Sequence, residues 1–426
     1  MISYTIPGLH VREHTVDVPL DWSDPSSESI TVFARELVDP VRKDEDLPCL
    51  LFLQGGPGGK SPRPVESVAW IGHALKRYRV ILMDQRGTGR SMPVSGRRMA
   101  AMTADEGAEY LACFRADSIV ADAEHLRKTV FGDRRWSTLG QSYGGFLTLT
   151  YLSKAPEGLI ACYVTGGLPG LEPSAAEVYR RTYPRVAAKN REYYARYPHD
   201  VERIGRIADR LAADDVRLAD GDRLTVRRFQ SLGIDFGMKP GFERIHWLVD
   251  EAFDGDELSD TFLEQVGGLS SYRTNPLFAA LQESIYGSGA GATGWAAEAE
   301  RNRQAEFAED ARPLLLTGEM MYPWMFAEIQ GLRPFQGAVE RLAQRPHWPE
   351  LYDVERLAAN DVPVAAAVYF DDMYVDSGLQ LKTARRVGNV QAWVTNEYEH
   401  DGIRAERVFA RLTELVRSVG GGVPAR

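Results

Sequence analysis

The stretch Gly140-Gln141-Ser142-Tyr143-Gly144 decides the fold class. It follows a short apolar strand pattern and opens a helical pattern over residues 143–154. A serine flanked by small residues at such a junction fits a nucleophile elbow, because bulky neighbours would clash with the adjoining strand and helix. The amide groups at the helix start favour a developing negative charge beside the serine. We therefore take Ser142 as a candidate nucleophile; a glycine-rich turn with a chance serine is the alternative.

The pattern around this elbow predicts a mostly parallel sheet with helices on both faces. Continuous apolar runs alternate with helical stretches, which is typical of strands buried on both sides. Before these runs, the first fifty residues alternate apolar and polar positions and predict two antiparallel edge strands, 14–19 and 29–37. The expected parallel strands are 49–53, 79–83, 137–140, 159–165, 362–370 and 390–395, and the expected helices are 117–130, 143–154, 379–386 and 405–416.

The middle of the chain differs from the flanking parts in composition and in its predicted elements. From residue 170 to 359 it is rich in Arg, Glu and Ala, interrupted by Gly and Pro, and it carries many aromatic residues. After residue 359 the alternation of predicted strands and helices resumes. We therefore predict one α/β domain, residues 1–169 and 360–426, with a mainly helical cap domain, residues 170–359, inserted in the second half.

Composition narrows the function classes. The 426 residues hold 50 Lys and Arg against 60 Asp and Glu, a net charge of -10. Such a chain repels phosphate backbones, so nucleic acid and anionic membranes are poor expected partners. Its 3 cysteines show no ligand-like spacing, which argues against a disulfide framework or a zinc site. Without an export signal or an apolar run of about 20 residues, we expect a cytoplasmic protein. The oligomeric state stays open.

Two glycine-rich loops follow the first two parallel strands. The loop Gly55-Gly56-Pro57-Gly58-Gly59 lets backbone amides approach an anion closely, so Gly56, together with Tyr143, is a candidate oxyanion-hole donor. An ordinary tight turn is the alternative. In the second loop, residues 84–91, we expect Asp84 and Arg86 to form a buried pair that braces the first loop.

A serine nucleophile needs a base and an acid, which follow it in the chain order Ser, Asp, His in this architecture. The strand 362–370 ends in Asp371-Asp372, and the last strand runs into His400. His400 is the only histidine after that strand. Each of these residues alone is more simply a solvated loop residue, but together with Ser142 they indicate a catalytic triad.

Taken together, GGPGG, DQRGTGRS, GQSYGG and the late Asp and His resemble the proline iminopeptidase (prolyl aminopeptidase) family of α/β-hydrolases with larger caps. The resemblance covers residues 50–170 and 361 onward. It implies serine-dependent release of N-terminal proline from small peptides, without metal or cofactor. It assigns Ser142 as nucleophile, Asp372 as acid, with Asp371 as the alternative, and His400 as base. The family loop usually begins with His where this chain has Gln54.

The resemblance also implies cap carboxylates that bind the substrate's free amino group. Two segments are similar to these motifs, residues 241–247 and 317–324, and they give Glu243 and Glu319 as candidates. Glu319 follows an apolar run and lies among aromatic residues, where an unpaired carboxylate is costly to bury. Trp324 and Tyr374 are candidate apolar walls for a proline ring. A solvated helix face for the glutamates and cap core for the aromatics are the alternatives.

Two other functions remain open at this stage. An esterase, a lactonase or a less selective aminopeptidase would keep the triad and change the substrate, because a fold and a triad do not fix specificity. A non-catalytic binding scaffold is the other alternative.

Overall fold

The computed structural model describes residues 2–67, 69–172 and 174–422. Its centre is a nine-stranded sheet of order β1-β2-β3-β5-β4-β6-β7-β12-β13. The pairings from β1 to β5 are antiparallel, and those from β5 to β13 are parallel. The strands are β1 (Ile2–Ile6), β2 (Leu9–Pro19), β3 (Ser29–Val38), β4 (Cys49–Leu53), β5 (Arg79–Met83), β6 (Trp136–Gln141), β7 (Leu159–Thr165), β12 (Val364–Tyr369) and β13 (Val390–Thr395).

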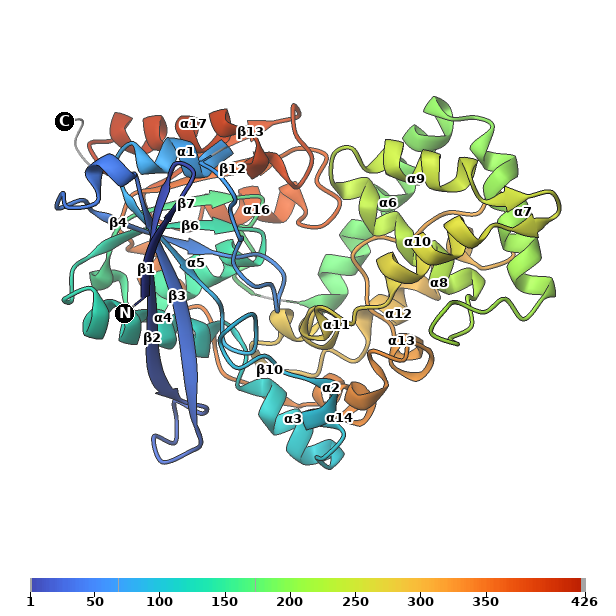
Figure 1. Ribbon diagram of the computed structural model, residues 1–426, viewed down its shortest axis with the longest axis horizontal. Coiled ribbons are helices and arrows are strands. Elements are labelled where there is room, and N and C mark those ends of the chain that lie inside the picture. Colours follow the sequence, from blue (N-terminus) through green and yellow to red (C-terminus); the bar gives the residue numbers. More distant parts are fainter. Residues whose placement is uncertain (1, 68, 173, 423–426) are drawn as a thin grey trace.

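Helices cover both faces of this sheet, so the mostly parallel, doubly covered sheet that the sequence predicts is confirmed. Figure 1 shows α1 (Ala69–Leu75) and α17 (Glu406–Ser418) above the sheet, with α4 (Ala116–Val130) and α5 (Tyr143–Lys154) below it. Each face has its own apolar core. Burial on both sides explains why the central strands are continuous apolar runs. The remaining core helices are α2 (Gly96–Met99), α3 (Ala104–Ala112) and α16 (Ser377–Ala384).

The chain between β7 and β12 is mainly helical and extends to one side of the sheet (Figure 1). Its α14 packs against α3 of the core, and its α15 packs against α5. We call this part the cap. Its helices are α6 (Ala175–Arg196), α7 (Asp200–Ala213), α8 (Val226–Gln230), η3 (Ser231–Gly237), α9 (Gly241–Asp250), α10 (Asp260–Ser270), α11 (Pro276–Leu281), α12 (Ala296–Arg301), α13 (Pro323–Glu328), α14 (Gln336–Ala343) and α15 (Val354–Ala358). The exact domain boundaries stay a prediction.

The N-terminal region differs from expectation in one respect. The two predicted antiparallel strands exist as β2 and β3, but β1 pairs with β2 and forms the edge of the sheet. The short β1 alternates apolar and polar residues, Ile2-Ser3-Tyr4-Thr5-Ile6, but it is exposed along most of its length, and the predicted strands began only at residue 14. In the part of the chain that the structure describes, no helix is both long and apolar enough to cross a bilayer.

Candidate active site

The elbow between β6 and α5 holds Ser142 in a strained conformation, with φ 55° and ψ -122°. Such a conformation costs about 1–3 kcal/mol and persists only where the surroundings enforce it. Here the close packing of neighbouring glycines enforces the conformation of Ser142. A Cβ on Gly144 would lie 1.9 Å from the carbonyl oxygen of Leu53, and one on Gly140 would lie 2.3 Å from that of Gly144. The small residues of the motif are thus required by contacts between β4, β6 and α5.

The predicted base and acid meet at the ends of β13 and β12. His400 Nδ1 lies 2.7 Å from Asp372 Oδ2, and both side chains are buried. The other oxygen of Asp372 accepts hydrogen bonds from the amides of Tyr374, at 2.8 Å, and Val375, at 3.1 Å. These bonds fix the carboxylate toward the imidazole. The structure therefore brings Asp372, and not Asp371, against His400.

The electrostatics of His400 suit a base. Burial disfavours the imidazolium, but the charge of Asp372 and its hydrogen bond outweigh burial, and Glu319 adds to them, so the pKa of His400 is raised above its ordinary value. A raised pKa means that the ring takes a proton from a hydroxyl more readily. The hydrogen bond at Nδ1 leaves Nε2 as the proton acceptor.

The first glycine-rich loop lies directly against the elbow. A Cβ on Gly55 would lie 3.0 Å from the carbonyl oxygen of Gln141 and 3.1 Å from Cβ of Ser142, so the loop and the elbow are in close contact. Gly56 has φ +129°, a conformation that other residues rarely adopt. The carbonyl of Gln54 accepts a hydrogen bond from the Gln85 side chain at 2.8 Å, which ties the loop to the second glycine-rich loop. Tyr143 is the first residue of α5, so its amide is unpaired within the helix.

The pairing expected between Asp84 and Arg86 is wrong. Asp84 instead pairs with Arg63 at 2.6 Å and accepts from the amide of Ser61, and it therefore holds the chain that leaves the first loop. Arg86 pairs with Asp122 of α4 at 2.6 Å, with both side chains fully buried. Although they are two residues apart, Asp84 and Arg86 thus pair with different segments of the chain. Their partners come from segments that a local sequence pattern cannot identify.

Glu319 lies in the cap beside the His400–Asp372 pair. Its carboxyl acts electrostatically on His400, Asp372 and Tyr374. Burial raises its pKa to about 7, and the nearby Asp372 charge adds to that, while His400 and a hydrogen bond from Gln282 oppose it. The hydrogen bond comes from a neutral amide. The site thus combines two acidic groups, Glu319 and Asp372, with one imidazole.

Glu243 has a different environment. It lies in the first turn of α9, and its carboxylate is 2.5 Å from Arg196 of α6. It lines a surface groove that also contains Lys239 and Glu399. Its cationic partner is therefore already in place, and its role in binding an amine stays a prediction.

The two predicted aromatic walls lie in distinct places. The Tyr374 ring meets His400 edge-on, with centroids 4.8 Å apart, and its hydroxyl donates to the carbonyl of Ile234 in the cap. Trp324 is buried and stacks on Tyr322, with centroids 5.9 Å apart. Tyr374 therefore borders the catalytic pair, whereas Trp324 packs inside the cap. Contact of either one with substrate stays a prediction.

The sequence analysis missed a second buried carboxylate, Glu283. It is 7% exposed, and burial raises its pKa. Glu283 and Glu319 both act on the buried tyrosines Tyr179 and Tyr286, so the two carboxylates border the same aromatic cluster. The sequence did contain a signal for the burial of Glu283. Glu283 follows the apolar run 277–281 after one intervening residue, as Glu319 follows the run 313–316 after two.

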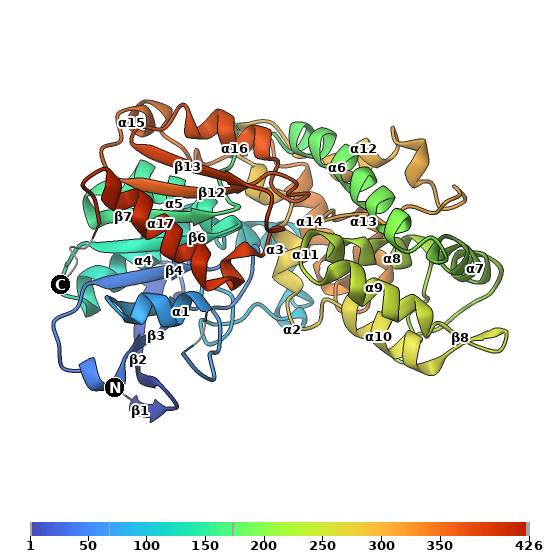
Figure 2. The same cartoon turned by 90° about the horizontal axis from the view of Figure 1, so that it is seen from above.

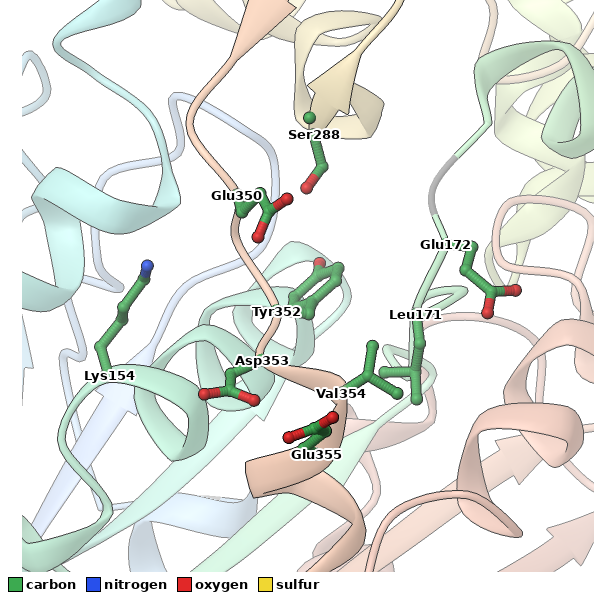
Figure 3. Close-up of a pocket in the computed structure, with 10 residues that line it drawn as sticks. Lys154, Leu171, Glu172, Ser288, Glu350, Tyr352, Asp353, Val354 and Glu355 are labelled. Atoms are coloured by element: carbon green, nitrogen blue, oxygen red, sulfur yellow. The ribbon is translucent and has the colours of Figure 1, made fainter.

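A surface hollow of about 690 Å³ lies where the cap meets the core (Figure 3). Four of the ten residues that line it are acidic: Glu172, Glu350, Asp353 and Glu355. No member of the predicted triad lines it. A smaller cavity shares Glu172 and Tyr352 with this hollow and reaches residues of α5 and η4 (Ser284–Tyr286). Within the described ranges, no cluster of three or more His, Cys, Asp or Glu is arranged to hold a metal ion.

Comparisons with known proteins agree with this geometry. Residues 48–234 match the model of the alpha/beta hydrolase fold. A proline iminopeptidase of Aeromonas sobria is 46% identical over 420 residues, which cover 98% of this chain and 99% of the relative. A proline iminopeptidase of Aspergillus aculeatus is 34% identical, with 97% and 95% covered. Because the similarity extends over the cap as well as the core, the chain belongs to the proline iminopeptidase family of α/β-hydrolases.

Proposed function

We propose that this protein is a serine aminopeptidase that releases proline from the N-terminus of small peptides. The observation that carries the proposal is the position of Glu319, a cap carboxylate held beside a hydrogen-bonded His–Asp pair. A general esterase needs no carboxylate there, because a neutral acyl group gains nothing from it. A substrate whose free ammonium group belongs to the residue at the scissile bond gains a charge-assisted hydrogen bond from such a carboxylate.

In the proposed mechanism, His400 removes the proton from the hydroxyl of Ser142 as the oxygen attacks the carbonyl carbon of the N-terminal residue. Asp372 holds the imidazole tautomer and stabilises the imidazolium that forms. The negative charge on the carbonyl oxygen is stabilised by the amides of Gly56 and Tyr143. His400 then protonates the leaving amine. Water, activated by His400, hydrolyses the acyl-enzyme and frees Ser142.

Selection for a free N-terminus follows from charge. Glu319 in its ionised form makes a charge-assisted hydrogen bond to the substrate ammonium, and such bonds are roughly twice as strong as neutral ones. Glu283 contributes a second acidic group to the same aromatic surroundings, and Glu243 stays a candidate amine ligand. Tyr374 is a candidate wall for the proline ring. An acylated N-terminus would leave Glu319 desolvated without a cation, which is costly.

Three substrates test the proposal. We expect Pro-arylamide to be cleaved, N-acetyl-Pro-arylamide to be essentially inert, and a short neutral acyl ester to be cleaved slowly. Equal cleavage of the free and acetylated arylamides would refute the amine-selection argument and favour an esterase or a less selective peptidase. Failure of a serine-directed phosphonate to label the protein would favour a non-catalytic scaffold. A cytoplasmic location stays a prediction from the sequence.

A further inference from the structure

Three basic side chains lie on one face of cap helix α6. Arg181, Arg185 and Lys189 are four residues apart, so they follow one another along the same side of the helix. All three form ion pairs with the loops that follow β12 and β13. Figure 2 shows α6 beginning beside α16, which follows the first of these loops, and running outward along the cap. These two loops carry the predicted acid and base.

Arg185 holds the loop that carries Asp372 from both sides. Its Nε lies 2.7 Å from Asp376 Oδ2, its Nη1 donates to the carbonyl of Phe370 at 2.9 Å, and its Nη2 donates to Ser377 Oγ at 2.9 Å. Phe370 precedes Asp372 by two residues, and Asp376 follows it by four. One planar guanidinium thus fixes both ends of the turn that positions the acid.

Lys189 holds the loop that carries His400. Its Nζ lies 2.8 Å from Oε1 of Glu399, the residue directly before His400. The side chains are 6% and 17% exposed, so solvent screens this pair little. The amide of His400 also donates to the carbonyl of Gly237 in the cap, at 3.0 Å. The cap therefore holds the proposed base through its own amide and through the side chain of the residue before it.

The same helix also holds the segment that leads to Glu319. Asn190, next to Lys189, is fully buried. Its side-chain amide donates to the carbonyl of Leu316 at 2.8 Å, and its oxygen accepts from the amide of Leu316 at 2.8 Å. Glu319 follows three residues later. Adjacent residues of α6 thus contact the loop of the base and the strand-like segment of the cap carboxylate.

We propose that α6 is the element that sets the geometry of the whole site, with Arg185 and Lys189 as positioning residues for the Asp372–His400 pair. The inference rests on the proposed triad. The contacts of α6 with the two core loops align Asp372 and His400 with Ser142. The contact of Asn190 with Leu316 sets the distance from Ser142 to Glu319. Misplacement of reacting groups by about 1 Å can cost a hundredfold in rate, so loss of these contacts should act on turnover.

The experiment measures three quantities for each variant: the rate at which a small neutral fluorophosphonate labels Ser142, kcat and KM for Pro-arylamide, and the melting temperature. We expect Lys189→Met to lower the labelling rate and kcat together by about tenfold or more, with little change in KM. Lys189→Arg should restore most of both. Arg191→Met is the matched control, because Arg191 lies on the same helix but forms an exposed pair with Glu306. It should behave as wild type.

A double variant separates positioning from simple charge burial. Lys189→Met alone leaves the carboxylate of Glu399 unpaired and can fail to fold. Lys189→Met combined with Glu399→Gln removes both charges. If stability returns but labelling stays slow, positioning is supported. If stability and labelling both return to wild-type values, the proposal is overturned.

Arg185→Met provides an independent variant at a more exposed position, and a wild-type labelling rate there would also count against the proposal. The proposed triad has its own control in Ser142→Ala. Labelling of Ser142→Ala, or no labelling of the wild type, would refute the triad. Normal labelling of wild type and of both the Lys189 and Arg185 variants would refute only the role of α6.

Discussion

Replacing Glu319 by Gln tests the central claim about specificity with a minimal change of shape. The amide keeps the size and planarity of the carboxylate and removes its charge. A hydrogen bond to a charged partner is worth about 1.5–3 kcal/mol, which corresponds to roughly a ten- to hundredfold loss in kcat/KM if the bond is realised in the transition state. We expect a loss of that size for Pro-arylamide, and a change of less than about threefold for a neutral acyl ester that uses no amine site.

The pH dependence gives a second, independent signature of the same substitution. Glu319 has a pKa of about 7, and it must be ionised to bind an ammonium group. In the wild type, kcat/KM for Pro-arylamide should therefore rise through pH 7. The Glu319 charge also raises the pKa of His400, which must be neutral to accept the serine proton. Without that charge the pKa of His400 falls, so the acid limb for the ester should move to lower pH in Glu319→Gln.

Both signatures come from one set of measurements, kcat/KM against pH for the arylamide and the ester with both proteins. Glu243→Gln is the matched comparison, because Glu243 pairs with Arg196 and should affect the arylamide less. Equal losses on the two substrates would show that Glu319 supports the catalytic machinery generally and would refute the amine-binding argument. An unchanged acid limb would show that its charge does not act on His400.

Four further substitutions test the elbow and the triad. Ser142→Ala should lower kcat by about a million-fold while leaving the melting temperature near that of wild type, as shown by thermal unfolding and arylamide assays. Asp372→Asn should lower kcat on the order of ten-thousandfold because the amide favours the wrong imidazole tautomer, whereas Asp371→Asn should cost far less; the reverse order would move the acid upstream. Gly144→Ala should abolish activity or folding, since its methyl group would lie 1.9 Å from a carbonyl oxygen, and a fully active variant would refute the packing argument.

The central sheet and the elbow were predictable because their signals are local. A strand buried on both faces must be a continuous apolar run, and the helix after Ser142 begins where the glycines allow the turn. The predicted strands 49–53, 79–83 and 159–165 coincide with β4, β5 and β7. In contrast, β1 is only five residues long and exposed, so its apolar and polar alternation was not separated from that of the longer strand β2 with which it pairs.

Side-chain partners were much harder to predict than backbone elements. Asp84 and Arg86 are neighbours in the sequence with opposite charges, yet their partners are Arg63 and Asp122. Sequence proximity suggests a pair, but the direction of each side chain is set by the backbone of an irregular loop. The sequence shows which side chains are charged, and a buried charged side chain needs a partner of opposite charge. It does not show which residue that partner is.

The environments of the cap carboxylates were also hard to predict from sequence, but one sequence feature distinguishes them. Glu243 and Glu319 were both candidates by resemblance, with Glu319 favoured by its sequence context, and Glu319 is the one that interacts electrostatically with His400 and Asp372. What distinguishes Glu319 is the apolar run before it, because a carboxylate that follows buried residues is forced into a desolvated position where its pKa rises and a cation is favoured. Glu283 follows such a run too and is 7% exposed. For Glu283 and Glu319, the apolar segment before each residue is therefore the sequence feature that indicates a desolvated carboxylate, which the proposed amine-binding role requires.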